Sequence, residues 1–365
     1  MNELNLTDEQ IDALKELMAT PTPTGSEHAG MMVLAKRIMA KTSLRPTLDV
    51  HGNLHCVLDR GAKKTVMLEG HVDEIGFIVQ HIDDDGLVYL SAVGGVTVPL
   101  MAAERVVIFG RGGKVYGVFG PRPPHLMTTE ERRRVAPTEL KNAPLDIGAS
   151  NRAEAEALVA VGDLAVVDAS WRNLAGSRVS CRGFDNRIGA FAMAEAFIRL
   201  ATSPCGCGVN VHYVATVMEE IGLVGGHTAA FSVKPDIGIC SDVTFATDVN
   251  KEDRRTTGDI RLGRGASVAR GPIYHKALTD RLLQAADAAK VPYQLKASPK
   301  GTGNNAWSMR LDAGGAAVAL VSVPLRYMHS PVETIDLRDV ASVIEIVAKG
   351  VGSLDDGFNL LPEQP

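Results

Sequence analysis

The sequence lacks an excess of positive charge and lacks long apolar runs. Its 38 lysine and arginine residues against 43 aspartate and glutamate residues give a net charge of -5. The basic cluster EERRRVAP (residues 130–137) is too short to form a nucleic-acid-binding surface. No apolar stretch is long enough to span a bilayer, and MNELNLTDEQ at the N-terminus has no apolar signal region. We therefore expect neither a nucleic-acid partner nor a membrane partner.

Cysteine is also scarce. The five cysteines are an odd number scattered along a long chain, which does not indicate a disulfide framework. Cys205 and Cys207 have C-x-C spacing, so they do not form the C-x-x-C motif of redox proteins. A reducing, cytoplasmic location is expected.

The length predicts two domains, because 365 residues exceed the size at which one hydrophobic core usually stops growing. The content of 45% hydrophobic and 22% charged residues is typical of a soluble globular protein. Between residues 74 and 178 the chain consists of short β-rich pieces separated by turns. Four of these pieces are IGFIVQHI, GLVYLSAV, RVVIFG and KVYGVFG. Many short strands at close spacing predict a small barrel or sandwich.

Outside this segment, helices alternate with apolar strands. Residues 185–200 form a predicted helix, and residues 209–218, 236–241 and 316–324 are apolar, β-branched runs typical of a covered sheet. The predicted fold is an α/β domain of residues 1–73 and 179–365, interrupted by a β-barrel domain at residues 74–178.

Side chains that can bind metal occur where the predicted strands end or where a helix begins. They are His71, Asp185, the pair Glu219 and Glu220, Asp242, and His329. In open α/β sheets, functional sites gather beyond the carboxyl ends of the strands. If these strands are parallel, all of these groups meet at one edge.

Each group alone also has a structural explanation. Asp185 could be only a helix N-cap, and Asp242 and His329 could be a capping residue and a loop histidine. Asp73 shares a face with His71, so it could orient this imidazole as carboxylates commonly do for metal-bound histidines. The combination of groups at successive strand ends favours a metal centre over separate structural roles.

Histidine and carboxylate ligands without cysteine suit zinc, cobalt or manganese. Two metal ions need about this many ligands if one carboxylate bridges them. Neighbouring residues lie on opposite sides of the backbone, so one of Glu219 and Glu220 can bind metal while the other faces a water molecule. That water needs a base to accept its proton.

The sequence resembles the two-metal aminopeptidases that include the tetrahedral, glutamyl and deblocking aminopeptidases, a family with members labelled endoglucanase. The resemblance covers about residues 10–350. The matching segments are PTPTGSE, DVHGNL, EGHVDEIGFIV, GVFGPRPPH, LDIGAS, GFDNRIG, MEEIGLVGG, CSDVTFATD, VPYQ and VPLRYMHSP.

The resemblance implies a mixed-sheet α/β metallopeptidase domain with an inserted PDZ-like β-barrel that serves in dimerisation. It implies two divalent ions, zinc or cobalt, with Asp185 bridging them. Glu220 and His329 would complete one site, and His71 and Asp242 the other. Glu219 would be the general base, and Asp73 would support His71. It also implies peptide substrates and homo-oligomers, as dimers that assemble into a dodecamer.

Two segments depart from the family pattern. GTGNNAW, with Asn304 and Asn305, replaces the usual GTDA near the substrate site, and GRGASVARGP is longer than the usual form. We expect a metal-dependent aminopeptidase that removes N-terminal residues from peptides. The alternatives are an amidase or deacylase of N-acyl amino acids and a non-catalytic assembly protein. A glycosidase is disfavoured, because its carboxylate pair acts without metals.

Overall fold

The computed structural model describes residues 4–120, 122–129, 139–203, 207–249, 251–301 and 303–361. The basic cluster at 130–137 and Cys205 lie outside these ranges. The helices are α1 (Asp8–Ala19), α2 (His28–Lys41), α3 (Arg152–Leu158), α4 (Phe184–Thr202), α5 (Val224–Val233), α6 (Arg254–Thr257), α7 (Lys276–Ala289), α8 (Asn305–Leu311) and α9 (Leu337–Gly352). Short 3-10 helices are η1 (Val98–Met101), η2 (Pro124–Leu126), η4 (Leu140–Asn142) and η5 (Asp312–Gly314).

The largest sheet runs in the order β1-β2-β12-β3-β13-β17-β15-β16, with β14 also paired to β17. Its strands are β1 (Thr47–Leu48), β2 (Leu54–Leu58), β3 (Thr65–His71), β12 (Asn210–Thr216), β13 (Ile237–Cys240), β14 (Val243–Phe245), β15 (Ala266–Arg270), β16 (Tyr293–Ala297) and β17 (Ala317–Leu325). The four central strands β12, β3, β13 and β17 are mutually parallel, whereas β2 and β15 pair with them antiparallel. The parallel centre places four carboxyl ends at one edge.

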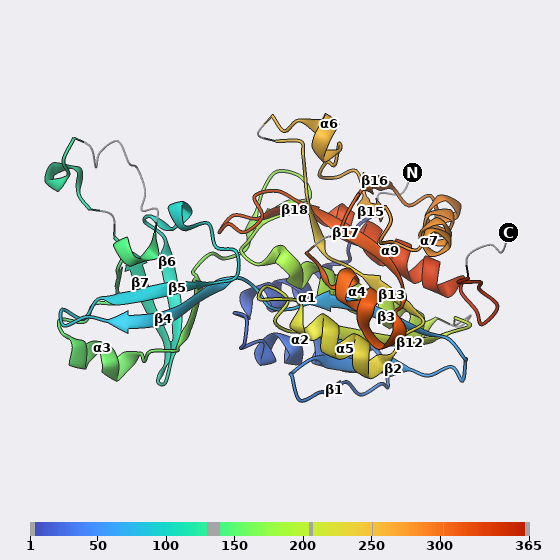
Figure 1. The fold of residues 1–365 in the computed structure, drawn as a ribbon, viewed down its shortest axis with the longest axis horizontal. Helices are drawn as coiled ribbons and strands as arrows, with labels where there is room; N and C mark the ends of the chain where they lie inside the picture. Colours follow the sequence, from blue (N-terminus) through green and yellow to red (C-terminus); the bar gives the residue numbers. More distant parts are fainter. Residues whose placement is uncertain are drawn as a thin grey trace.

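Helices cover both faces of this sheet (Figure 1). Side chains alternate along each strand, so that on β3 Val66 and Leu68 join the core beneath α1, α2, α4, α7 and α9. Met67 points the other way and packs in the core beneath α5 and α8. Burial on both faces explains why the central strands are continuous apolar runs.

Six antiparallel strands close a barrel in the order β4-β5-β8-β7-β6-β9. They are β4 (Gly76–Ile82), β5 (Val88–Val93), β6 (Arg105–Gly110), β7 (Gly113–Phe119), β8 (Leu145–Asp146) and β9 (Leu164–Val167). The barrel has its own core, built around residues such as Phe77, Val106 and Phe119. Figure 1 shows it, with α3, as a separate body beside the α/β part. The predicted fold class is therefore confirmed: a mixed α/β fold with a barrel inserted in it.

A three-stranded sheet forms where the chain leaves the barrel and re-enters the α/β part. Here β10 (Arg172–Asn173) pairs with β11 (Arg178–Ser180), and β11 pairs with β18 (Thr334–Asp336) near the C-terminal helix. The predicted insertion, residues 74–178, thus contains all six barrel strands and also β10, which pairs outside the barrel. No helix in the described ranges is both long and apolar enough to cross a bilayer.

Helix α4 approaches β3 so closely that only glycine fits at residue 70. A Cβ atom added to Gly70 would lie 2.6 Å from the backbone nitrogen of Ala190 and 2.8 Å from its Cα. Backbone atoms cannot move aside as a flexible side chain can. This contact fixes the start of α4, where Asp185 lies, next to the end of β3, where His71 lies.

We expect Gly70→Ala to destabilise the protein by about 1–3 kcal/mol, because the added methyl group forces α4 away from the sheet. Thermal or urea unfolding measures the change. The matched control is Gly112→Ala, since a Cβ there meets nothing within 4 Å. Equal stability of the two variants would show that α4 does not depend on this contact.

Candidate metal centre

The carboxyl ends of four parallel strands carry the side chains that the sequence singled out. His71 is the last residue of β3 and lies opposite Thr216, the last residue of β12, so Glu219 and Glu220 emerge beside it. Asp242 follows β13, and His329 follows β17. The structure thus brings all of these groups, which the sequence spreads over more than 250 positions, to one edge of the sheet.

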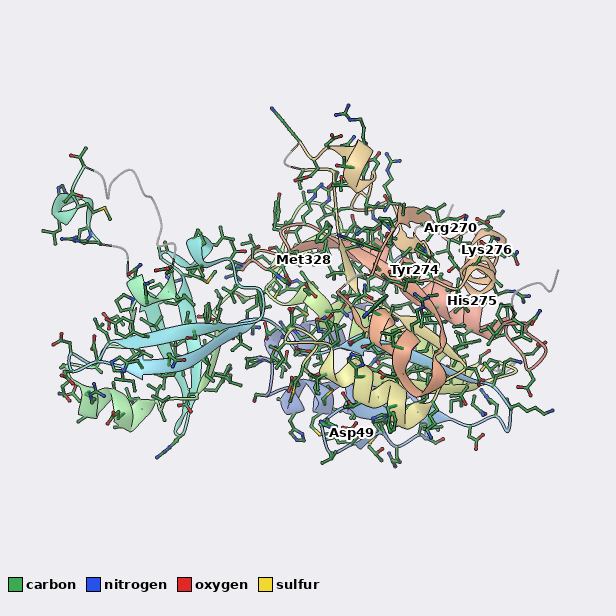
Figure 2. The ribbon with its side chains drawn as sticks, viewed as in Figure 1. Asp49, Arg270, Tyr274, His275, Lys276 and Met328 are labelled. Carbon is green, nitrogen blue, oxygen red and sulfur yellow. The ribbon has the colours of Figure 1, made fainter. Side chains whose placement is uncertain are left out.

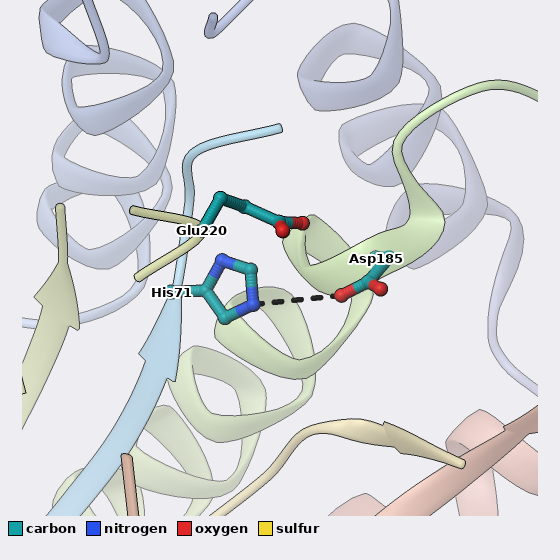
Figure 3. Close-up of side chains that lie close together, drawn as sticks. All are labelled: His71, Asp185 and Glu220. Atoms are coloured by element: carbon teal, nitrogen blue, oxygen red, sulfur yellow. Dashed lines mark ion pairs between the residues drawn. The ribbon is translucent and has the colours of Figure 1, made fainter. Parts of the chain in front are cut away.

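Asp185 lies between two imidazoles at the start of α4. Its Oδ1 atom is 3.5 Å from Nε2 of His71, and its Oδ2 atom is 3.3 Å from Nε2 of His329. Figure 3 shows Asp185, His71 and Glu220 directed into one shared space. Each oxygen of this carboxylate faces a different histidine, which is the arrangement a bridging ligand requires.

The other carboxylates surround the same two histidines. Nε2 of His71 is 3.7 Å from Oε2 of Glu219 and 3.9 Å from Oδ1 of Asp242. Nε2 of His329 is 3.6 Å from Oε2 of Glu220. Two compact sets of three ligand atoms result, one of His71, Asp185 and Glu220 and the other of His71, Glu219 and Asp242. Glu219 thus lies as close to His71 as Asp242 does, and His329 belongs to neither compact set.

Asp73 connects the two central strand ends. Nδ1 of His71 is 3.3 Å from its Oδ1 atom and 3.1 Å from its backbone oxygen. The same carboxylate accepts hydrogen bonds from the backbone N–H groups of Glu219, at 3.0 Å, and Glu220, at 3.1 Å. Thr24 donates its hydroxyl to it at 2.9 Å. This fully buried carboxylate therefore orients the imidazole and the backbone of both glutamates together.

Glu333 has a similar position on the other side of the centre. Its two oxygens accept hydrogen bonds from the backbone N–H groups of Asp185, at 3.1 Å, and His329, at 2.9 Å. Burial and repulsion by Asp185 raise the pKa of Glu333 to about 8. Sequence reasoning missed this residue, because Glu333 begins no helix and ends no strand of the main sheet. Its position four residues after His329 was the one available signal.

The barrel also contributes a backbone contact. The backbone of Gly95, just after β5, hydrogen-bonds the imidazole of His329 and raises its pKa, although the hydrogen bond with Asp185 is the larger cause. A Cβ atom at Gly95 would lie 2.6 Å from Nδ1 of His329. His329 is thus held from two sides, by an α4 carboxylate and by the inserted barrel.

The buried carboxylates at this edge raise one another's pKa values. Burial, with repulsion from the neighbouring carboxylates, raises the pKa of Glu219 and of Glu220 to about 9 each and that of Asp242 to about 7. Asp185 is also buried, but its hydrogen bonds to His329 and His71 lower its pKa to about 2. Buried carboxylates this close together are stable as anions when a cation lies among them.

The donor set fits divalent metal ions. Imidazole nitrogens and carboxylate oxygens meet here without a cysteine, which suits zinc or cobalt. In the described residues, Oε1 of Glu220 is buried without a hydrogen-bond partner. A buried carboxylate oxygen that accepts no hydrogen bond is available to bind a cation.

A cavity of about 470 Å³ opens onto the centre. Met328, labelled in Figure 2 on the side of the α/β part that faces the barrel, lines this cavity next to His329. Asn304, from the segment that departs from the family pattern, also lines it.

Asn305, the other departing residue, lies beneath the centre rather than in the cavity. Its Nδ2 donates to Oε1 of Glu69 at 2.7 Å and to the hydroxyl of Thr216 at 3.0 Å. Glu69 is fully buried on β3, two residues before His71. Asn305, which departs from the family pattern, therefore forms buried polar contacts that join α8 to the strands β3 and β12.

Residues 52–346 match the family model described as M42 glutamyl aminopeptidase. The chain belongs to this family. It is 33% identical to the lysyl aminopeptidase of Pyrococcus furiosus over 336 residues, which cover 92% of this chain and 94% of that protein. As a member of the M42 family the protein is an aminopeptidase, hence a hydrolase, and peptidases of this family depend on metal.

Solved structures agree with this assignment. A TET aminopeptidase from the marine sediment archaeon Thaumarchaeota archaeon SCGC AB-539-E09 superposes with a TM-score of 0.88 at 27% identity, covering 96% of this chain and 98% of that one. The TET1 peptidase of Pyrococcus horikoshii superposes with a TM-score of 0.81 at 28% identity, covering 94% of this chain and 100% of that one. The latter is described as assembling into a tetrahedron or a large octahedral shell. The predicted family resemblance is confirmed.

We expect Gly95→Ala to weaken the binding of zinc or cobalt by about 10–100-fold, because the new methyl group displaces the imidazole of His329. Calorimetric titration of metal-free protein measures this affinity. Gly120→Ala, where a Cβ meets nothing within 4 Å, is the control and should bind metal as the unmodified chain does. Unchanged metal affinity in Gly95→Ala would show that the barrel does not help to position the candidate metal ligands.

Proposed function

We propose that this protein is a metal-dependent aminopeptidase that removes N-terminal residues from peptides with the help of two divalent ions. The observation that carries the proposal is the position of Asp185, with one oxygen toward His71 and the other toward His329. A carboxylate in this position could be a ligand to two divalent ions at once. Glu220 and His329 would complete one site, and His71 and Asp242 the other.

Zinc or cobalt ions at these sites would supply Lewis acidity toward the scissile carbonyl and lower the pKa of a water molecule. Glu219 is proposed as the general base and acid. Glu219 lines the cavity, where its carboxylate can accept a proton from the attacking water and then donate this proton to the leaving amine. Asp73 keeps the backbone of Glu219 and the ring of His71 in place during both transfers.

We also propose a homo-oligomer, in which dimers formed through the barrel assemble into a dodecamer. The similarity to the TET1 peptidase of Pyrococcus horikoshii supports an assembly of this kind. A cytoplasmic location is proposed as well. Free thiols at Cys56, Cys181, Cys207 and Cys240, the cysteines within the described ranges, are compatible with a reducing compartment.

We expect Glu219→Gln to bind metal with unchanged stoichiometry but to lose about 10²–10⁴-fold in kcat, because the amide cannot accept the proton. Steady-state hydrolysis of aminoacyl-p-nitroanilides measures the rate, and elemental analysis measures the metal. Glu156→Gln, on the exposed side of α3, is the control and should retain full activity. A Glu219→Gln variant with near-normal turnover would assign the base to another residue.

Removal of metal with a chelator should abolish peptide hydrolysis, and added zinc or cobalt should restore it, because buried imidazole and carboxylate ligands bind these ions reversibly. The assay compares aminoacyl-p-nitroanilides with N-acetyl amino acids before and after chelation. Restored activity on the N-acetyl compounds alone would make the protein an amidase. Failure to bind either ion would favour a non-catalytic assembly protein.

A further inference from the structure

The backbone around the two adjacent glutamates is held by side chains from distant parts of the chain. The N–H groups of Glu219 and Glu220 donate to the carboxylate of Asp73. Two residues earlier, the N–H group of Val217 donates to Oδ1 of Asn53 at 3.1 Å. The short segment after β12 is therefore positioned by acceptors that belong to other elements, on both sides of its central residue.

That central residue, Met218, has a strained backbone. Its φ angle of 52° lies in the left-handed region, which is unfavourable for residues other than glycine. Such a conformation persists where the surrounding contacts determine it. The two side chains that follow diverge from this point. Oε2 of Glu219 is 3.7 Å from Nε2 of His71. Oε2 of Glu220 is 3.6 Å from Nε2 of His329, so the neighbouring carboxylates reach different imidazoles.

Glu27 accepts the N–H group of Met218. Its Oε1 atom is 3.2 Å from this nitrogen and 2.8 Å from the backbone nitrogen of Gly25, which also donates to it. Glu27 is the N-cap residue of α2, but its side chain does not cap that helix. Burial raises the pKa of this carboxyl group, and Asp73 acts in the same direction. The side chain thus serves the segment of Met218 rather than its own helix.

Glu27 has no direct contact with the reacting groups. It is 4% exposed, and the described residues that line the cavity include Glu219 and Glu220 but not Glu27. Across the described ranges, no lysine, arginine or histidine forms an ion pair with it. Its effect on the candidate centre therefore passes through the backbone that it holds.

We propose that Glu27 is a positioning residue: by accepting the N–H group of Met218, it maintains the left-handed backbone that directs Glu219 and Glu220 to different imidazoles. This inference rests on the proposed function, in which Glu219 is the base and Glu220 a metal ligand. The role requires an acceptor oxygen at the correct reach and does not require a negative charge. A displacement of about 1 Å at a reacting group can lower a rate by about 10²-fold.

Two substitutions separate reach from charge. Glu27→Gln keeps a side-chain oxygen at the same reach and removes the charge, whereas Glu27→Asp keeps the charge and withdraws the oxygens by one methylene group. Aspartate is also a favoured N-cap residue, so Glu27→Asp should fold. With leucyl-p-nitroanilide and saturating zinc or cobalt, we expect Glu27→Asp to lower kcat about 10–100-fold and Glu27→Gln to stay within about threefold. Loss of activity in Glu27→Gln, or full activity in Glu27→Asp, overturns the proposal.

Met218→Gly tests whether Glu27 acts through the backbone. Glycine adopts positive φ about as readily as negative φ, so the left-handed conformation then needs less support. The loss of kcat that Glu27→Asp causes should therefore be much smaller when Met218→Gly is also present. A loss of the same size in both backgrounds would show that Glu27 acts by another route, and the proposal would be wrong.

Hydrogen exchange gives a readout that does not depend on turnover. Mass spectrometry of peptides that contain residues 215–223 measures exchange at the amide of Met218. We expect exchange to be about tenfold faster in Glu27→Asp and unchanged in Glu27→Gln, because only the first variant removes the acceptor. Glu16→Asp, at an exposed position of α1, is the matched control and should change neither exchange nor kcat. Equal exchange in Glu27→Asp and the control overturns the proposal.

The proposed function and this inference can fail separately. If the unmodified, metal-loaded protein hydrolyses leucyl-p-nitroanilide and Glu27→Asp does so equally well, only the positioning role is wrong. If the unmodified protein hydrolyses no aminoacyl substrate, the proposed function is wrong, and the exchange experiment still tests whether Glu27 holds the backbone. Circular dichroism of each variant establishes that the compared proteins are folded.

Discussion

The constraint that shapes this protein is the repulsion among carboxylates collected at one buried edge of a sheet. Asp185, Glu219, Glu220 and Asp242 cannot all be charged there without compensation. The chain supplies two imidazoles, and backbone N–H groups stabilise the flanking acids Asp73 and Glu333. Divalent ions would compensate the remaining negative charge of the carboxylates. The precise packing of α4 on β3 matters because it sets the distance between these charges.

The inserted barrel is joined to this edge by more than its two connecting segments. Its β5 strand leads into Gly95, whose backbone hydrogen-bonds the ring of His329. An insertion that has its own hydrophobic core would be expected to move independently. Here one of its backbone groups helps to hold a side chain of the candidate centre, which ties the geometry of the centre to the position of the barrel.

The sequence predicted the fold class and the convergence of the site because both depend on local patterns. Buried parallel strands are continuous apolar runs, so the polar residue after each run, such as His71 or Asp242, marks the shared edge. Glu333 and Gly95 could not be found in this way, since each acts through a contact between distant segments. The two-residue strands β8 and β10 are too short to show periodicity. The metal and catalytic roles remain predictions.

The order of the candidate ligands along the chain has a consequence for biosynthesis. His71 is translated first, the barrel follows it, and His329 comes 258 residues after His71. Because the edge is assembled from residues between 71 and 329, a ribosome-bound fragment that ends before residue 329 holds only part of the candidate set. The candidate centre is thus complete only after residue 329 has been synthesised, and no shorter N-terminal fragment of the chain holds both histidines.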